Sequence, residues 1–267
     1  MQKPHIRRLA LVQMQVEAGQ VANNFDRMKQ GLYRAVSGAE KPDLIMLPEM
    51  WNTGYALAQI GEIADPDSER TRTFFADFCR EHQVNVLAGS VAELQRDGSI
   101  RNTSHLFGRD GRVIASYSKI HLFRLLDEHN HLQAGETPCS FELDGIPAAM
   151  MICYDIRFPE LARKLALGGA QMLFVPAEWP HPRLHHWRTL LQARAIENQM
   201  YVVACNAVGK SGDAVFFGHS MVIDPWGEVL AEAGEDDEVL TVEIDVSLVE
   251  EVRRRIPVFA DRRPQLY

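Results

Sequence analysis

The sequence predicts an α/β fold in which two mixed sheets pack face to face, with helices outside. Short apolar segments typical of strands alternate with amphipathic helical segments, and hairpin signals then interrupt the alternation. The chain has 267 residues, 46% of them hydrophobic, and contains no Pro/Gly/Ser-rich linker, so we expect a single domain, 1–267. Many short strands within one domain favour two sheets over one.

The first half of the chain alternates strands with helices. The predicted strands are Ile6–Gln13, 43–47 and 84–89. One predicted helix is capped by Asn23 or Asn24 and carries Phe25, Met28, Leu32 and Val36 on one face. The other is Glu69–His82, with Phe74, Phe75 and Phe78 inward. This alternation indicates a sheet that is covered by helices.

The second half of the chain mixes hairpins with further helices. Hairpins are predicted around the turns 108–111 and 225–227, joining strand 103–107 to 113–117 and strand 218–224 to 228–231. The other predicted strands are 146–152, 172–175, 201–205 and 239–244. The predicted helices are 159–169, 184–199 and 246–254, and the tail IPVFADRRPQLY is irregular.

Composition excludes several classes of protein. The net charge of −8 offers no basic surface for nucleic acid. No segment reaches the length of a transmembrane helix, and the first apolar run is too short for a signal peptide. The four cysteines are scattered without a CxxC pair, so we expect neither a disulfide framework nor a zinc site. These features favour a cytoplasmic protein with no metal and no cofactor.

Three polar residues follow predicted strands and could carry chemistry. Glu49 follows strand 43–47, Lys119 follows strand 113–117, and Cys153 lies between strand 146–152 and a helix. Helix N-terminal amides near Cys153 would favour its thiolate. If these strand ends face the same way, a nucleophile, a base and a cation that can stabilise an oxyanion converge.

Each of these residues also has a purely structural interpretation. Cys153 can be a small buried hydrophobe, Glu49 a loop carboxylate and Lys119 a solvated edge lysine. A Cys–His pair is a further alternative, although none of its candidates has a distinguishing motif: His121, His181, His185 and His186. A metal-dependent hydrolase lacks an HExxH motif, and a non-enzymatic scaffold stays open because a fold does not guarantee activity.

Three longer segments carry a family resemblance. They are LIMLPEMWNTGY around Glu49, SYSKIHLF around Lys119 and MICYDIRFPEL around Cys153, and the three residues are 70 (119 − 49) and 34 (153 − 119) positions apart. Further matching segments are AEWP at 177–180, ARAIENQMYVVACN at 193–206 and GHSMVIDPWGEVL at 218–230. In this order and over essentially its full length, the chain resembles the nitrilase (carbon–nitrogen hydrolase) superfamily.

The resemblance implies a set of roles for the residues. Cys153 would be the nucleophile, Glu49 the general base and Lys119 the cation that stabilises the oxyanion. The backbone N–H of Tyr154 would be the second oxyanion donor. Glu128, in the looser match LLDEHNHLQAG, would position Lys119 and the substrate, although a solvated loop acid is the alternative.

The resemblance also implies an architecture, an assembly and a substrate class. It implies a four-layer α-β-β-α sandwich that forms a homodimer or a larger homo-oligomer, with 245–267 near the interface. KIHLFRLLDEH, EWPHPRLHHW and ARAIENQ resemble the ω-amidase-like branch, which hydrolyses the terminal amide of 2-oxoglutaramate and 2-oxosuccinamate. Another small amide, an N-carbamoyl amine or a nitrile would use the same catalytic residues.

A substrate of this class carries a carboxylate, so its pocket needs a cation. Arg124 and Arg157 are the candidates, although Arg157 could instead form a structural ion pair at a helix start. The aromatic residues Trp51, Trp179 and Tyr154 are expected to line the pocket, and each could equally be ordinary core.

Overall fold

The first sheet is built around β1 (Ile6–Gln13), whose side chains alternate between two cores. The computed structural model describes residues 5–211 and 213–266. Leu9 and Leu11 join a core that also holds Phe174 of the second sheet, whereas Ala10 and Val12 join the core beneath two helices. Successive strand residues point to opposite faces, so the apolar run LALV fits a strand that is buried on both sides.

The two sheets contain eight and six strands. The first runs in the order β16 (Glu238–Asp245), β1, β2 (Leu44–Met46), β4 (Asn85–Leu87), β6 (Ile100–Phe107), β5 (Val91–Leu94) and β3 (Asp65–Pro66), with β7 (Val113–Ser118) paired to β6. The second runs β15 (Val229–Glu232), β14 (Met221–Ile223), β11 (Tyr201–Asn206), β10 (Met172–Ala177), β9 (Ile146–Met150) and β8 (Cys139–Leu143). A separate ribbon pairs β12 (Val208–Ser211) with β13 (Ala214–Phe217).

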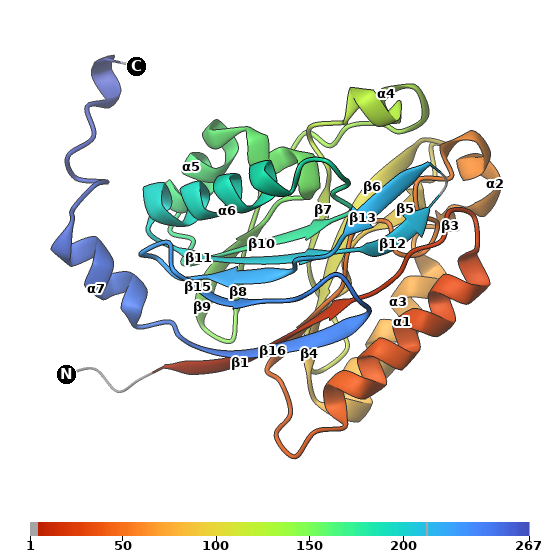
Figure 1. Ribbon diagram of the computed structural model, residues 1–267, viewed down its shortest axis with the longest axis horizontal. Coiled ribbons are helices and arrows are strands. Elements are labelled where there is room, and N and C mark those ends of the chain that lie inside the picture. The colour runs from red at the N-terminus through yellow and green to blue at the C-terminus, as the bar shows by residue number, and fades with distance from the viewer. Residues whose placement is uncertain (1–4, 212, 267) are drawn as a thin grey trace.

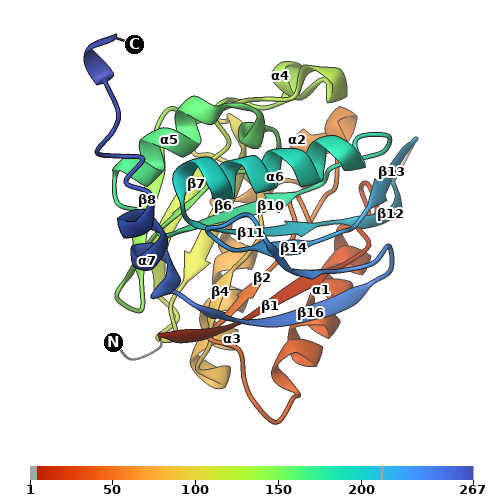
Figure 2. The same cartoon turned by 60° about the vertical axis from the view of Figure 1, so that its left-hand side comes forward.

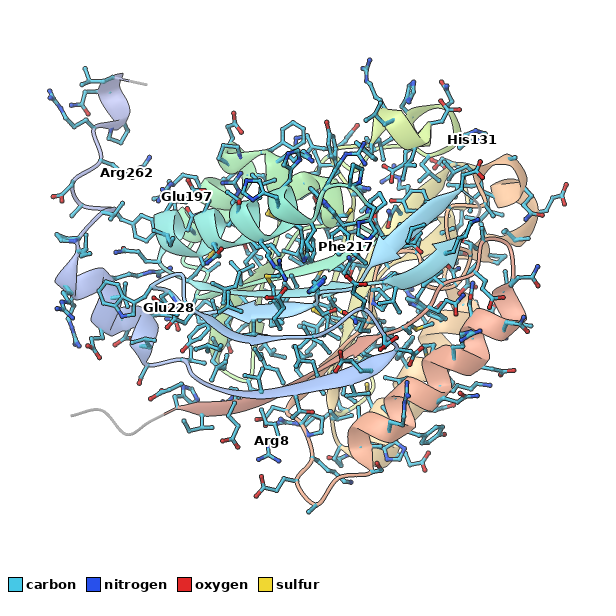
Figure 3. The ribbon with its side chains drawn as sticks, viewed as in Figure 1. Arg8, His131, Glu197, Phe217, Glu228 and Arg262 are labelled. Atoms are coloured by element: carbon cyan, nitrogen blue, oxygen red, sulfur yellow. The ribbon has the colours of Figure 1, made fainter. Side chains whose placement is uncertain are left out.

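Helices cover the outer face of each sheet (Figure 1). α1 (Val21–Val36) and α3 (Glu69–His82) cover the first sheet, and α5 (Pro159–Leu167) and α6 (Leu184–Asn198) cover the second (Figure 2). Side chains fill the space between the layers (Figure 3). The predicted four-layer α-β-β-α sandwich is therefore confirmed.

The remaining helices are short and lie at the ends of these layers. They are α2 (Ile60–Ile63), α4 (Glu128–His131), α7 (Leu248–Arg255) and 3₁₀ turns at Leu57–Gln59, Arg124–Leu126, Cys153–Arg157 and Pro264–Leu266. After α7 the chain extends away from the two sheets, and Arg262 lies on this tail (Figure 3).

One local prediction, the helix cap, is wrong. α1 begins at Val21, so neither Asn23 nor Asn24 caps it. The side chain of Asn24 instead bonds the backbone of Glu17 at 2.9 and 2.7 Å, tying α1 to the preceding loop. The predicted start of the helix after Cys153 is confirmed, because α5 begins at Pro159, and Cys153 itself begins a short 3₁₀ turn that was not predicted.

Candidate active site

The ends of strands from both sheets meet at one place. Glu49 follows β2, Lys119 follows β7 and Cys153 follows β9. The backbone N–H of Glu49 donates to the carbonyl of Ala177, at the end of β10, over 3.3 Å. This bond joins the two sheets where the three predicted residues converge.

The Glu49 carboxylate is fully buried and accepts four hydrogen bonds in addition to one from the Cys153 thiol. Its Oε1 lies 2.8 Å from Lys119 Nζ, 2.9 Å from the Tyr55 hydroxyl and 2.8 Å from Asn102 Nδ2. Its Oε2 accepts the backbone N–H of Glu178 at 2.8 Å. Burial alone would raise the pKa of Glu49, but the Lys119 ammonium and these bonds outweigh it and lower the pKa. Glu49 is therefore ionised.

Lys119 lies between two carboxylates. Its Nζ is 2.8 Å from Glu49 and 2.6 Å from Glu128 Oε1, and both acidic side chains are buried. Burial lowers the pKa of Lys119, but the charges of Glu128 and Glu49 outweigh it and raise the pKa well above its usual value. An ammonium has three N–H donors; two bond the carboxylates, and the third makes only a long contact of 3.4 Å with the Tyr55 hydroxyl.

Glu128 is held from two sides. Its Oε2 accepts the backbone N–H of Phe123 at 2.6 Å, and its Oε1 lies 2.6 Å from the Tyr55 hydroxyl as well as near Lys119. The alternative of a solvated loop acid is wrong, because Glu128 is fully buried. Burial raises the pKa of Glu128. The charge of Glu49 also raises this pKa, whereas the charge of Lys119 lowers it.

Cys153 has a strained backbone and a protonated thiol. Its φ of 46° lies in the left-handed region, which non-glycine residues rarely adopt and which recurs at active sites. Burial and then the charge of Glu49 raise the pKa of the thiol well above its usual value, with Lys119 opposing, and the thiol hydrogen-bonds to Glu49. Burial and the neighbouring carboxylate thus favour the thiol, whereas the expected helix N-terminal amides would act in the opposite direction.

The turn after Cys153 leaves one backbone donor free. Within residues 5–211 and 213–266, no acceptor bonds the N–H of Tyr154, as is usual in the first turn of a helix. Asp155 anchors this turn by accepting the N–H of Ile152 at 2.9 Å and the Tyr117 hydroxyl at 2.7 Å.

The structure does not form a Cys–His pair. His121 Nδ1 lies 2.7 Å from Asp155 Oδ1, so that histidine supports the turn. His181, His185 and His186 are exposed, in or just before α6. Glu49, bonded to the thiol, is instead the available base.

A small, narrow cavity opens onto Cys153. Its lining residues are Tyr55, Phe123, Cys153, Tyr154, Arg157, Glu178, Trp179, Pro180 and Arg183. The structure thus places Tyr154, Arg157 and Trp179 at the cavity, as expected.

Trp51 and Arg124 do not line this cavity, contrary to expectation. Trp51 is buried in the core beneath α1 and α3, where its indole N–H donates to the carbonyl of Ala88 at 2.7 Å. Its ring packs edge-on against Phe25 and Phe75. Arg124 is exposed in a 3₁₀ turn. Nearness in sequence to Glu49 and Lys119 did not translate into nearness to the cavity.

Two arginines at the cavity lack an acidic partner within the described residues. The guanidinium of Arg157 stacks on the Trp179 ring at 4.7 Å and lies 3.3 Å from His186 Nδ1. Arg183 lies over the Phe123 ring at 5.9 Å. Burial lowers the pKa of Arg157, and the nearby charge of Arg183 acts in the same direction. The alternative of a structural ion pair for Arg157 is therefore wrong.

Sequence reasoning missed four residues of the site: Tyr55, Asn102, Glu178 and Arg183. Glu178 directly follows β10, so the strand-end rule that selected Glu49 could also have found it. No comparable signal marks Tyr55 or Arg183, because loops bring them in.

The described residues contain neither a metal-binding cluster nor a membrane span. Across 5–211 and 213–266, no group of three His, Cys, Asp or Glu side chains could hold a metal ion. Over the same ranges, no helix is long and apolar enough to cross a membrane.

Known proteins share this fold and sequence. A CN-hydrolase superfamily protein from Xanthomonas campestris matches with a TM-score of 0.90 and 30% identity, over 97% of this chain and 98% of its own. Residues 8–254 match the family model described as carbon-nitrogen hydrolase. The chain belongs to the carbon–nitrogen hydrolase family, as predicted, and is a carbon–nitrogen hydrolase.

Two relatives with curated names are similar over nearly their whole length. A 2-oxoglutaramate amidase from Bacillus subtilis is 44% identical over 97% of this chain and 98% of its own. An omega-amidase from Homo sapiens is 33% identical over 97% of this chain and 96% of its own.

Proposed function

We propose that this protein is an ω-amidase that releases ammonia from the terminal amide of a short 2-oxo dicarboxylic acid, with 2-oxoglutaramate as the leading substrate. One observation carries the proposal. A buried Glu49–Lys119–Cys153 cluster opens onto a small cavity where Arg157 and Arg183 have no acidic partner among residues 5–211 and 213–266. The names of the two relatives support the same substrate class.

Acylation begins with the thiol of Cys153. Glu49 takes the thiol proton as the sulfur attacks the amide carbon, and the Lys119 ammonium and the Tyr154 N–H stabilise the oxyanion. The tetrahedral intermediate collapses as its C–N bond breaks. Glu49 returns the proton to the departing nitrogen, which leaves as ammonia, and a thioester remains on Cys153.

Deacylation uses the same groups in the reverse direction. Glu49 takes a proton from water, and the resulting hydroxide attacks the thioester carbon. The second oxyanion is again stabilised by Lys119 and the Tyr154 N–H. The C–S bond breaks, the sulfur regains its proton from Glu49, and the product acid leaves.

The two arginines favour an anionic substrate. A guanidinium binds a carboxylate through two parallel, charge-assisted hydrogen bonds. Glutamine carries the same amide but adds an α-ammonium, which the charges of Arg157 and Arg183 would repel. A 2-oxo acid has no such charge, so it should be the better substrate.

The assembly and the compartment belong to the same proposal. The tail after α7 extends away from the sheets and carries exposed Ile256 and Leu266, which a second copy could bury (Figure 1). We therefore expect a homodimer or a larger homo-oligomer. The scattered free cysteines favour the cytoplasm.

The test measures kcat/KM for 2-oxoglutaramate, glutamine, an N-carbamoyl amino acid and a simple nitrile, read by ammonia release. We expect 2-oxoglutaramate to be the best substrate, with R157M and R183M raising its KM more than they lower kcat. R124M is the matched control, because Arg124 is exposed and lies outside the cavity lining. A carbamoyl compound or nitrile that is tenfold better would exclude the ω-amidase. No turnover of any compound would favour a catalytically silent scaffold.

A further inference from the structure

A second carboxyl group lies beside Glu49. Glu178 directly follows β10, and its backbone N–H donates to Glu49 Oε2 at 2.8 Å. Its side chain is only 1% exposed and lines the cavity that opens onto Cys153. The mechanism derived above gives this side chain no task.

The carboxyl group of Glu178 has no hydrogen-bond partner in the described part of the protein. Neither of its oxygens is bonded, although Glu49 beside it accepts four bonds. A buried polar group without a partner is destabilising, so such a group in a ligand cavity points to a partner on the ligand.

The protonation of the Glu178 carboxyl limits which hydrogen-bonding groups of a ligand can pair with it. Burial, and then the charge of Glu49, raise the pKa of Glu178 well above its usual value, while Lys119 opposes them. These effects favour the protonated form of the Glu178 carboxyl. A neutral carboxylic acid keeps a carbonyl acceptor and gains one O–H donor.

We propose that Glu178 is a specificity-determining residue that selects primary amides by accepting one N–H of the substrate's amide nitrogen. The inference rests on the proposed amidase function. The departing nitrogen must lie beside Glu49, which returns a proton to it, and Glu178 borders Glu49 in the same cavity. A primary amide has two N–H groups, and Glu178, whose two oxygens are unbonded in the described residues, can accept one of them. An ester or a nitrile offers neither.

The test compares an amide with its matched ester. 2-Oxoglutaramate and the 5-methyl ester of 2-oxoglutarate form the same thioester on Cys153, so they differ only in the departing group. E178L removes the acceptor and should lower kcat/KM for the amide by roughly 10- to 100-fold, with a much smaller loss for the ester. E178Q stays neutral and keeps a carbonyl acceptor, so its amide-to-ester ratio should stay near that of the wild type.

Two further variants keep the test decisive. If E178L fails to fold, E178M, which has an unbranched side chain, takes its place. The ratio of kcat/KM for the amide to kcat/KM for the ester is measured within one protein, so the two variants can be compared directly. E160Q changes an exposed glutamate of α5 and should leave both rates unchanged. An equal loss for amide and ester in E178L or E178M would overturn the inference, as would an E178Q ratio as low as theirs.

The outcome separates this inference from the proposed function. If the wild type prefers an amide other than 2-oxoglutaramate, the substrate assignment is wrong. The same ratio is then measured on that amide and its ester. A ratio that falls in E178L but not in E178Q supports the role of Glu178, and a ratio unchanged in both excludes it.

Discussion

Glu49 and Glu178 are neighbouring buried carboxyl groups with opposite protonation states. Burial by itself acts to raise the pKa of both carboxyl groups, but at Glu49 other contributions outweigh it. Glu49 lies 2.8 Å from the Lys119 ammonium and accepts three further hydrogen bonds, whereas no protein group bonds the Glu178 carboxyl in the described residues. The site therefore holds an ionised base and a neutral acid side by side.

This arrangement predicts how stability depends on pH. Glu178 has a folded-state pKa well above the ordinary 4.5, so above that pH the folded protein keeps a proton that the unfolded chain releases. Stability from this group therefore falls as pH rises above 4.5, until the folded-state pKa is reached. E178Q cannot titrate. We expect the Tm of E178Q, measured by circular dichroism, to increase relative to the Tm of the wild type as the pH is raised from about 5 to about 8.

The difference in Tm between the wild type and E178Q isolates the titration of Glu178. The neighbouring charged groups, Glu49, Lys119 and Glu128, are present in both proteins. The effects of their own titrations therefore largely cancel when the two Tm values are subtracted. A difference in Tm that stays constant with pH would mean that Glu178 is ionised in the folded protein.

The sequence allowed only part of the site to be predicted at this scale. Glu49, Lys119 and Cys153 each follow a strand, and a polar residue there is unusual enough to be noticed. Trp51 and Arg124 lie close in sequence to Glu49 and Lys119, but such closeness says little about the direction in which a side chain leaves a loop. Whether such a residue faces the cavity depends on packing that only the fold defines.

At the scale of elements, the loop after β4 fixes the loop that carries Glu49. Gly89 has a φ of +58°, and a Cβ built on it would lie 1.9 Å from the carbonyl oxygen of Pro48. The next residue, Ser90, donates its N–H to that same oxygen at 3.2 Å and accepts the N–H of Met50 on its hydroxyl at 2.9 Å. The close approach needs glycine.

We therefore expect G89A to displace the Glu49 loop. The clash and the strained φ should lower stability by about 1–3 kcal/mol and reduce kcat. Chemical denaturation and ammonia release measure the two effects. G98A is the matched control, because Gly98 also has a positive φ, +84°, but has no atom within 4 Å of its built Cβ. A normal kcat in G89A would show that the loop tolerates the change.

The sequence predicted long elements better than short ones. β1 and α3 match their predicted bounds, because an apolar run and phenylalanines at helical spacing leave little ambiguity. β3, β5, β8 and the ribbon of β12 and β13 were not predicted. These strands are only two to five residues long, and partners distant in the sequence decide whether they pair.

At the scale of the whole molecule, the first and last strands of the described chain pair in one sheet. β1 pairs with β16 along its full length, from Ile6 opposite Asp245 to Gln13 opposite Glu238. The alternation of strands and helices was sufficient to predict the layers. It could not predict the course of the tail, which follows no local periodicity.

The tail gives a prediction about assembly. The full chain should sediment as a dimer or a larger oligomer at micromolar concentration, and removal of residues 256–267 should shift it towards monomer. A chain ending at residue 263 keeps Phe259, over which the guanidinium of Arg253 lies at 5.0 Å, and should be less affected. A full-length protein that sediments only as a monomer would contradict the proposed assembly.

The account depends most on Cys153 as the nucleophile. The decisive measurement is ammonia release from 2-oxoglutaramate by C153A, with folding verified by circular dichroism. Because the substitution removes the attacking atom, we expect a loss of at least about 1,000-fold in kcat. C139A is the control and should keep normal activity, since Cys139 lies on β8, outside the cavity lining. A folded C153A that retained more than about one per cent of the wild-type rate would contradict the mechanism.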